Sequence, residues 1–319
     1  MDRRRWSKIR AVTTGLLVAA CGGGTTTATP DTTPSPPWTA VASGDWVDGA
    51  LAAALPAPVT GVGRPGGLTA PEALAVVEAE VWVLDRARAR VVAFDADGAA
   101  RVVTEHDALA AATDLVATPD GGVWVALAGG RVAPVDRLAQ AFPLAEELAA
   151  LPLAVGTDSA LYVGELGGSE VYPLRVEGAT LAPDAQVAGR LRGLPGASGW
   201  VATVPADGAV VTLSREAATE TVPLPGRALA VALLTPAPTR CGAGALLLVT
   251  AVLTSEGQAD VLTVVTPGQG VGGQRVAPTP APYHTPLRAF AASPAGDVWQ
   301  LRLEPGGWQL ARWEVPCED

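Results

Sequence analysis

The chain has 319 residues, of which 49% are hydrophobic and 17% charged, and its formal net charge is −10. Lys8 is the only lysine, so a P-loop lysine, a Schiff-base lysine and a Ser-x-x-Lys nucleophile are excluded beyond it. Two histidines and three cysteines are too few for a polynuclear metal site with soft ligands. The acidic balance argues against nucleic-acid binding. We therefore expect no cofactor, no metal and no nucleic-acid partner.

Residues 1–20 have the pattern of an export signal. A basic segment is followed by the short apolar stretch 11–20; its basic residues are Arg3, Arg4, Arg5, Lys8 and Arg10. The stretch is too short to span a bilayer, which takes about 20 apolar residues, and is typical of a secretory signal peptide. Because the basic segment also resembles a twin-arginine signal, the export route stays open between the Sec and twin-arginine systems.

The signal ends at a cysteine. Small residues precede it in Val18-Ala19-Ala20-Cys21-Gly22, which resembles the lipobox of bacterial lipoproteins. The resemblance implies that Cys21 is acylated and becomes the mature N-terminus, so that the protein contacts a membrane through it. An ordinary signal with a chance cysteine is the alternative. We predict an exported protein, lipid-anchored to the outer face of the cytoplasmic membrane or in the outer membrane and cell envelope.

Residues 21–37 follow as a predicted tether. Between Gly22 and Pro37 only Gly, Thr, Ala, Pro, Asp and Ser occur. Such a segment offers no apolar pattern that could form a core, so we expect it to be disordered. The folded domain is then residues 38–319.

A short apolar and aromatic motif recurs through that domain. Its copies are centred on Trp82, Trp124, Tyr162, Trp200, Leu247 and Trp299, with a period near 40 residues. Strand-like runs separated by Gly, Asp and Pro turns surround each copy, which is typical of antiparallel meanders. Four strands in each of six units predict an all-β fold, a six-bladed β-propeller of four-stranded antiparallel blades.

The last unit is one strand short. After Trp299 only residues 307–315 can form a further strand, whereas residues 38–46 precede the first unit and have no partner there. We predict that this N-terminal segment completes the last blade, which would remove an open sheet edge. Helical turns are expected only in residues 105–112 and 144–151.

Cys241 and Cys317 remain once Cys21 is assigned to the lipid. Two cysteines in an exported protein suggest a disulfide. Such a bridge would tie the C-terminus to the fifth unit. A pair of free thiols is the alternative.

The Pro-Asp-Gly-Gly-Val-Trp-Val segment at 119–125 and its cousins resemble the repeat of NHL, SMP-30/gluconolactonase and streptogramin-lyase-like propellers. The resemblance covers roughly residues 70–315 and implies architecture rather than activity. Calcium-dependent lactonases of this group use a Glu, Asn and Asp set, and this chain contains no Asn. The lyases use a His with an acidic partner, yet neither His106 nor His284 lies in a matching motif. No catalytic residue is therefore transferred.

The weak catalytic candidates are Tyr283, His284 and Arg288, which precede the first strand of the last unit and would lie at a rim of the propeller channel. The alternative is a Pro-rich connecting loop with exposed polar side chains. We expect His106 to lie in a solvated turn, and the motif Trp and Tyr residues to pack between blades.

The sequence favours a non-catalytic protein, acting as a binding or scaffold module for an envelope protein or a small ligand. A propeller hydrolase or lyase with a site assembled at the channel rim is one alternative. A sensing subunit of a larger envelope complex is another.

Overall fold

The chain divides into a unit of residues Met1–Ser35 and a unit of residues Pro36–Asp319. The computed structural model describes residues 36–44, 46–47, 50–51, 71–118, 121–144, 153–155, 161–164, 170–177, 180–183, 191–192, 194–196, 199–279, 288–304 and 307–317. Cys21, Tyr283 and His284 lie outside the described residues. In the part that is described, no helix has the length and apolar character needed to cross a membrane.

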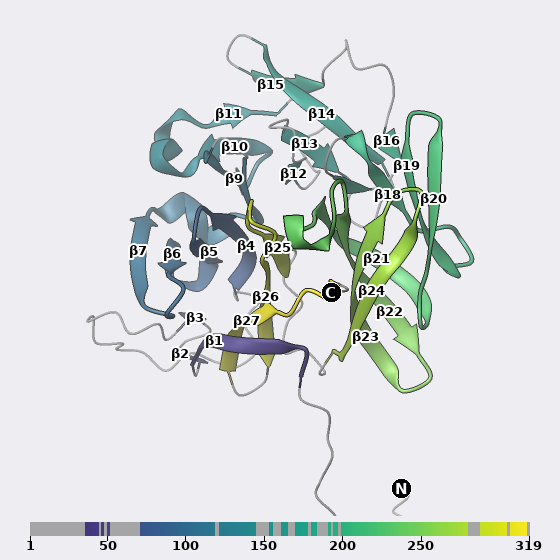
Figure 1. Ribbon diagram of the computed structural model, residues 1–319. Helices are drawn as coiled ribbons and strands as arrows, with labels where there is room; N and C mark the ends of the chain where they lie inside the picture. The colour runs from purple at the N-terminus through teal and green to yellow at the C-terminus, as the bar shows by residue number, and fades with distance from the viewer. Residues whose placement is uncertain are drawn as a thin grey trace, which may run out of the picture. The chain divides into compact units, whose positions relative to one another are not determined.

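The second unit is all-β and contains several four-stranded antiparallel sheets, as predicted (Figure 1). The β4–β7 sheet consists of β4 (Pro71–Val77), β5 (Glu80–Asp85), β6 (Arg90–Phe94) and β7 (Ala100–Glu105). The β8–β11 sheet consists of β8 (Asp114–Ala117), β9 (Val123–Leu127), β10 (Arg131–Pro134) and β11 (Phe142–Pro143). In both sheets the strands pair in chain order, which is the meander that the repeat predicts.

The next sheets continue the pattern, with one departure from it. The β12–β16 sheet consists of β12 (Leu153–Val155), β13 (Leu161–Gly164), β14 (Glu170–Glu177), β15 (Thr180–Pro183) and β16 (Leu191–Arg192), so it has five strands because both β15 and β16 pair with β14. The β17–β20 sheet consists of β17 (Leu194–Pro195), β18 (Val201–Thr203), β19 (Val210–Arg215) and β20 (Ala218–Pro223). The β21–β24 sheet has the longest strands, β21 (Arg227–Pro236), β22 (Leu246–Thr254), β23 (Gly257–Thr266) and β24 (Gly270–Pro278).

The terminal sheet joins the two ends of this unit. Its order is β1-β27-β26-β25, formed by β1 (Trp38–Gly44), β27 (Gly307–Trp313), β26 (Val298–Glu304) and β25 (Phe290–Ala292). β1 pairs antiparallel with β27, from Trp38 opposite Trp313 to Gly44 opposite Trp308. The prediction that the segment before the first unit completes the last sheet is therefore confirmed.

Short elements lie between the sheets. β2 (Trp46–Val47) and β3 (Ala50–Leu51) form a two-stranded pair, and the 3-10 helices are η1 (Arg86–Arg88), η2 (Asp107–Ala111), η3 (Val135–Gln140) and η6 (Thr239–Cys241). η2 falls within the predicted helical segment 105–112. Most of the other predicted segment, 144–151, lies outside the described residues.

The repeated motif lies in a strand at every described copy except the one at Trp200. There β18 begins only at Val201, and Gly199 has a φ of 76°. This left-handed conformation is open to glycine but is incompatible with an extended strand. At this copy the strand therefore begins only at the last residue of the motif.

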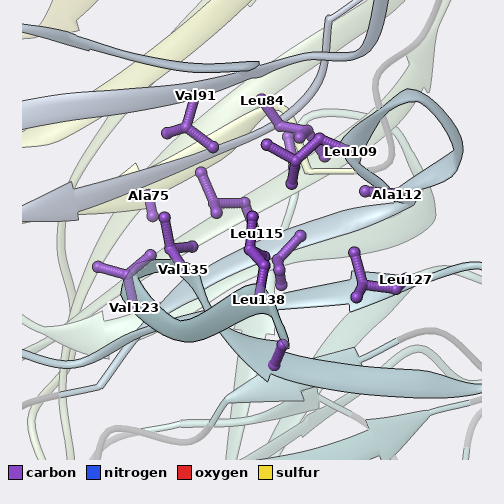
Figure 2. Packing of buried hydrophobic residues seen from close by; sticks show 13 residues of the cluster. Ala75, Leu84, Val91, Leu109, Ala112, Leu115, Val123, Leu127, Val135 and Leu138 are labelled. Atoms are coloured by element: carbon purple, nitrogen blue, oxygen red, sulfur yellow. The ribbon is translucent and has the colours of Figure 1, made fainter. Parts of the chain in front are cut away.

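Apolar faces of consecutive sheets pack on one another. Figure 2 shows the cluster between the β4–β7 and β8–β11 sheets, in which Leu84 and Val91 from the first sheet meet Leu115 from the second. Leu109 from η2 and Leu138 from η3 close the same cluster. The 3-10 turns therefore cap a core between two sheets.

A second cluster joins the terminal sheet to the β4–β7 sheet. Leu74 and Phe94 pack with Leu301 and Trp308, all with 4% exposure or less. The rings of Phe94 and Trp308 lie 5.3 Å apart. Gly98, in the turn after β6, approaches β1 so closely that an added Cβ would lie 2.5 Å from the Val41 carbonyl oxygen. Gly98 also has a φ of 82°, so both the close approach and the backbone conformation favour glycine at this position.

Candidate functional site

Of the three predicted rim residues, the structure describes Arg288. It precedes β25 and forms an isolated parallel bridge with Ala73 of β4. The Leu74 amide donates a hydrogen bond to the Arg288 carbonyl oxygen at 3.2 Å. The backbone at Arg288 is therefore held against the first strand of the β4–β7 sheet.

The Arg288 side chain reaches a different sheet. Its Nε and Nη2 donate to Oδ1 and Oδ2 of Asp114, at the start of β8, over 2.9 and 2.8 Å. The two side chains are 19% and 1% exposed. Burial disfavours the guanidinium charge, but Coulombic attraction to Asp114 and the hydrogen bonds that Asp114 accepts outweigh it and raise the pKa of Arg288. Arg288 thus connects the terminal, β4–β7 and β8–β11 sheets.

A second buried ion pair lies at the end of β5. Arg90 Nε donates to Oδ2 of Asp85 at 2.8 Å, with side-chain exposures of 7% and 0%. The two residues are cross-strand partners, and Asp85 is also opposite Pro71, the first residue of β4. Pairing lets both charges be buried where an isolated charge would be too costly.

A third polar cluster was not found from the sequence. Gln300 of β26 donates from Nε2 to Asp260 Oδ2 of β23 at 3.0 Å, and its Oε1 accepts from Trp313 Nε1 at 3.0 Å and from Arg302 Nη1 at 3.3 Å. Arg302 also lies over the Trp38 ring, with Cζ 4.2 Å from its centroid. The cluster therefore links β23 to three strands of the terminal sheet.

Burial sets the protonation chemistry of this cluster. It raises the pKa of the Asp260 carboxyl and lowers the pKa of the Arg302 guanidinium. A signal for the cluster existed in the sequence, because Gln300 is polar where the other motif copies end in Val or Leu. No local pattern marked Asp260, which pairs with Gln300 across 40 residues.

His106 has a structural part rather than a chemical one. Its Nδ1 accepts a hydrogen bond from the Ala108 amide at 3.1 Å and so caps the N-terminus of η2. The residue is exposed, as the prediction of a solvated turn required.

The structure contains a disulfide between Cys241 and Cys317, the pair suggested by the sequence, with Cα atoms 4.7 Å apart. Both cysteines border the apolar cluster that contains Trp313 and that Trp38 also borders. The bridge thus joins η6, between β21 and β22, to the segment after β27.

Across the described ranges, no three His, Cys, Asp or Glu side chains gather in a way that could hold a metal ion. The charged groups near the first strands, Arg288, Asp114, Asp85 and Arg90, neutralise one another in pairs. The described charged residues around Arg288, the described residue of the candidate rim site, therefore form structural ion pairs.

Comparison with known proteins gave neither a matching family model nor a matching curated protein. Among solved structures, the chain is similar to a virginiamycin B lyase from Staphylococcus aureus (11% identity, 77% of this chain and 96% of the other, TM-score 0.40). It is also similar to a putative gluconolactonase, with 16% identity over 80% of this chain and 93% of the other and a TM-score of 0.43. A member of the DUF4221 family from Bacteroides vulgatus is similar with 7% identity over 76% of this chain and 92% of the other and a TM-score of 0.48.

Proposed function

We propose that residues 38–319 form a closed six-bladed β-propeller in which each sheet is one blade. The supporting observation is the cyclic order of the sheet contacts. Apolar clusters join β4–β7 to β8–β11, β17–β20 to β21–β24, β21–β24 to the terminal sheet, and the terminal sheet back to β4–β7. Contacts of β8 with β12 and of β14 with β17 join the remaining neighbours. A return from the last sheet to the first is what a closed ring requires.

Closure is tested by deleting β1. Removal of residues 38–44 would expose the edge of β27 and uncover the Trp308 ring. We therefore expect the variant to aggregate and to lose cooperative unfolding. Deletion of residues 22–35 is the matched control. It should leave unchanged the urea concentration at which half of the protein is unfolded, which we call the urea midpoint. A β1 deletion with the parent midpoint would refute closure.

We further propose that this propeller is exported and held at a membrane by acylated Cys21. The support is the basic segment, the apolar stretch 11–20 and the small residues before Cys21. The parent chain should then require detergent for extraction, whereas the Cys21→Ser chain should not. Mass spectrometry that finds no acyl group on Cys21 of the parent chain would refute the anchor.

For the biochemical role, we propose a ligand-binding module without a catalytic step. The observation that carries it is the Arg288–Asp114 pair. Arg288 is the one described residue of the candidate rim site, and both of its hydrogen bonds to Asp114 join sheets. Large exposed apolar side chains support the same role, because Leu229, Leu253, Val271 and Val276 all lie on the β21–β24 sheet.

The binding role is tested with the full chain carrying Cys21→Ser. A ligand that binds the folded state raises the unfolding temperature, so a panel of small metabolites is screened by thermal shift. Mass spectrometry then follows each hit over hours. Unchanged hits support a binding module; conversion of a hit to product would make the protein an enzyme and overturn the role. A panel in which no compound raises the unfolding temperature would also count against it.

A further inference from the structure

Two leucines on adjacent strands are exposed to an unusual degree. Leu229 of β21 is 46% exposed and Leu253 of β22 is 48% exposed. Apolar side chains of this size normally enter the core, and neighbouring exposed ones mark contact sites more often than single ones do.

The strand register places both leucines on one face. Ala228 pairs with Val252 and Ala230 with Ala251, so Leu229 is the extra residue of a β-bulge. Ala228 and Val252 are buried on the opposite face, Ala228 within the cluster shared with the β17–β20 sheet. The bulge sets both Leu229 and Ala230 opposite Ala251, and Leu253 alternates with the buried Val252, so the other face carries the set that we call the apolar face: Leu229, Ala230, Ala251 and Leu253.

The same side of the sheet is covered further along. Leu233 pairs with Val249, and both pack with Phe290 of β25 in the core shared with the terminal sheet. The apolar face is thus the uncovered continuation of a buried one.

Comparison with the β4–β7 sheet shows that the fold does not require this exposure. Leu253 is opposite Arg227, the first residue of β21, just as Asp85 is opposite Pro71, the first residue of β4. At these matching positions a carboxylate is 0% exposed and a leucine 48% exposed. Burial is normally favourable for a leucine and costly for a carboxylate, so the exposures at these two positions are the reverse of what is expected.

Arg227 adds a positive charge beside the apolar face. It is exposed, and its stem packs against Gly208, where an added Cβ would lie 2.8 Å from Arg227 Cγ. Within the described residues its guanidinium forms no ion pair or hydrogen bond. Glu256, in the turn that follows Leu253, does not pair with it. A cation without a partner next to an apolar surface is complementary to a molecule with both characters.

We propose that Arg227 and the apolar face bind a small molecule with an apolar body and an anionic head group. This inference rests on the binding role proposed above and names the site and the ligand class. The apolar body covers Leu229 and Leu253, and Arg227 pairs with the head group, a geometry that its planar guanidinium suits.

Two dyes that differ in one group test the proposal. 1-Anilinonaphthalene-8-sulfonate carries an apolar body and an anion, and N-phenyl-1-naphthylamine has the same body without the sulfonate. Fluorescence titration of the full Cys21→Ser chain without detergent should give one site per chain, with the sulfonate dye bound about tenfold more tightly.

Variants then separate the two parts of the site. Leu253→Ser should weaken both dyes about tenfold, because it removes apolar contact from both. Arg227→Met, which retains the apolar stem, should weaken only the sulfonate dye, and Arg227→Lys should restore it in part. Val276→Ser is the matched control, because Val276 is 44% exposed on the same sheet but lies on β24.

Equal dye binding by the parent and Leu253→Ser chains would overturn the site, as would equal loss in Val276→Ser. A concentration-dependent dimer that Leu253→Ser dissolves would assign the face to a second copy of the chain and overturn it too. A metabolite from the thermal screen that still binds Leu253→Ser would refute this site while leaving the binding role standing.

Discussion

Two buried arginines, Arg288 and Arg302, hold their charges in different ways. Arg288 has two hydrogen bonds from its guanidinium to the Asp114 carboxylate, at 2.9 and 2.8 Å. Arg302 lies on the Trp38 ring at 4.2 Å, with Glu304 Oε1 3.6 Å from its Nη2. Its Nε has no hydrogen-bond partner among the described residues.

The pKa of each guanidinium follows from these surroundings. Asp114 overcomes the effect of burial and raises the pKa of Arg288, whereas burial dominates at Arg302 and lowers its pKa. A carboxylate with two short hydrogen bonds thus compensates a buried charge, whereas a ring, an amide and the more weakly interacting carboxylates Glu304 and Asp260 do so only in part. The Arg288 region should therefore depend strongly on Asp114, and the Arg302 region more weakly on each of its several neighbours.

The largest expected effect comes from removing the partner of Arg288. Asp114→Asn keeps the size of the side chain but removes the carboxylate charge that faces the buried Arg288 guanidinium, so we expect a loss of about 3–5 kcal/mol in the free energy of unfolding. Urea unfolding followed by tryptophan fluorescence measures it.

The control for this prediction is the exposed pair Arg137–Asp136, whose side chains are 59% and 76% exposed. Asp136→Asn should change stability by less than about 0.5 kcal/mol. The double variant Asp114→Leu with Arg288→Met should recover most of the loss, because both charges are gone. Equal losses in Asp114→Asn and Asp136→Asn would remove the contrast between the two arginines.

The second largest effect on stability is expected from the disulfide between Cys241 and Cys317, which lies in the same part of the molecule as Arg302. Cys241 and Cys317 are 76 residues apart and border the same apolar cluster as Trp38. Replacing both by Ser should cost about 2–4 kcal/mol, since a loop of this length is released in the unfolded chain. The reduced parent chain should match the double variant in urea unfolding. A parent chain that is unaffected by reductant would show that the bridge contributes nothing to stability.

Local pattern was sufficient to predict the sheets and the segment that completes the last one. Alternating apolar strands and Gly-rich turns are properties of neighbouring residues, and the unpaired strand at 38–46 followed from counting. The ion pairs could not be predicted, because Asp114 and Arg288 are 174 residues apart and meet only when the sheets are packed. The strand at Gly199 begins late because this residue has a positive φ, which a glycine permits but does not require.

The aromatic partner of Arg302 should matter less than the carboxylate of Arg288. Trp38→Leu removes the ring under the guanidinium and should cost about 1–2 kcal/mol, from cation–π attraction and lost burial. A double-mutant cycle with Arg302→Met isolates the pair, and we expect a coupling energy of about 1 kcal/mol. Zero coupling would mean that Trp38 stabilises the terminal sheet by packing alone.

The smallest effect tests whether Asp260 compensates Arg302. Burial raises the pKa of Asp260 above its ordinary value of 3.8, so the folded state binds this proton more readily than the unfolded chain. The contribution of Asp260 to stability is then fully present below pH 3.8 and is lost as the pH rises through the raised value. Asp260→Asn keeps an oxygen for Gln300 but cannot titrate.

The free energy of unfolding of the parent chain, relative to that of Asp260→Asn, should therefore decline from about pH 3.5 to pH 7, by about 1.4 kcal/mol for each pH unit by which folding raises the pKa of Asp260. Urea unfolding of both chains across this range measures the difference. An increase with pH would mean that the folded protein favours the Asp260 carboxylate. Asp260 would then add a favoured carboxylate to that of Glu304 beside Arg302, and the contrast with Arg288 would disappear.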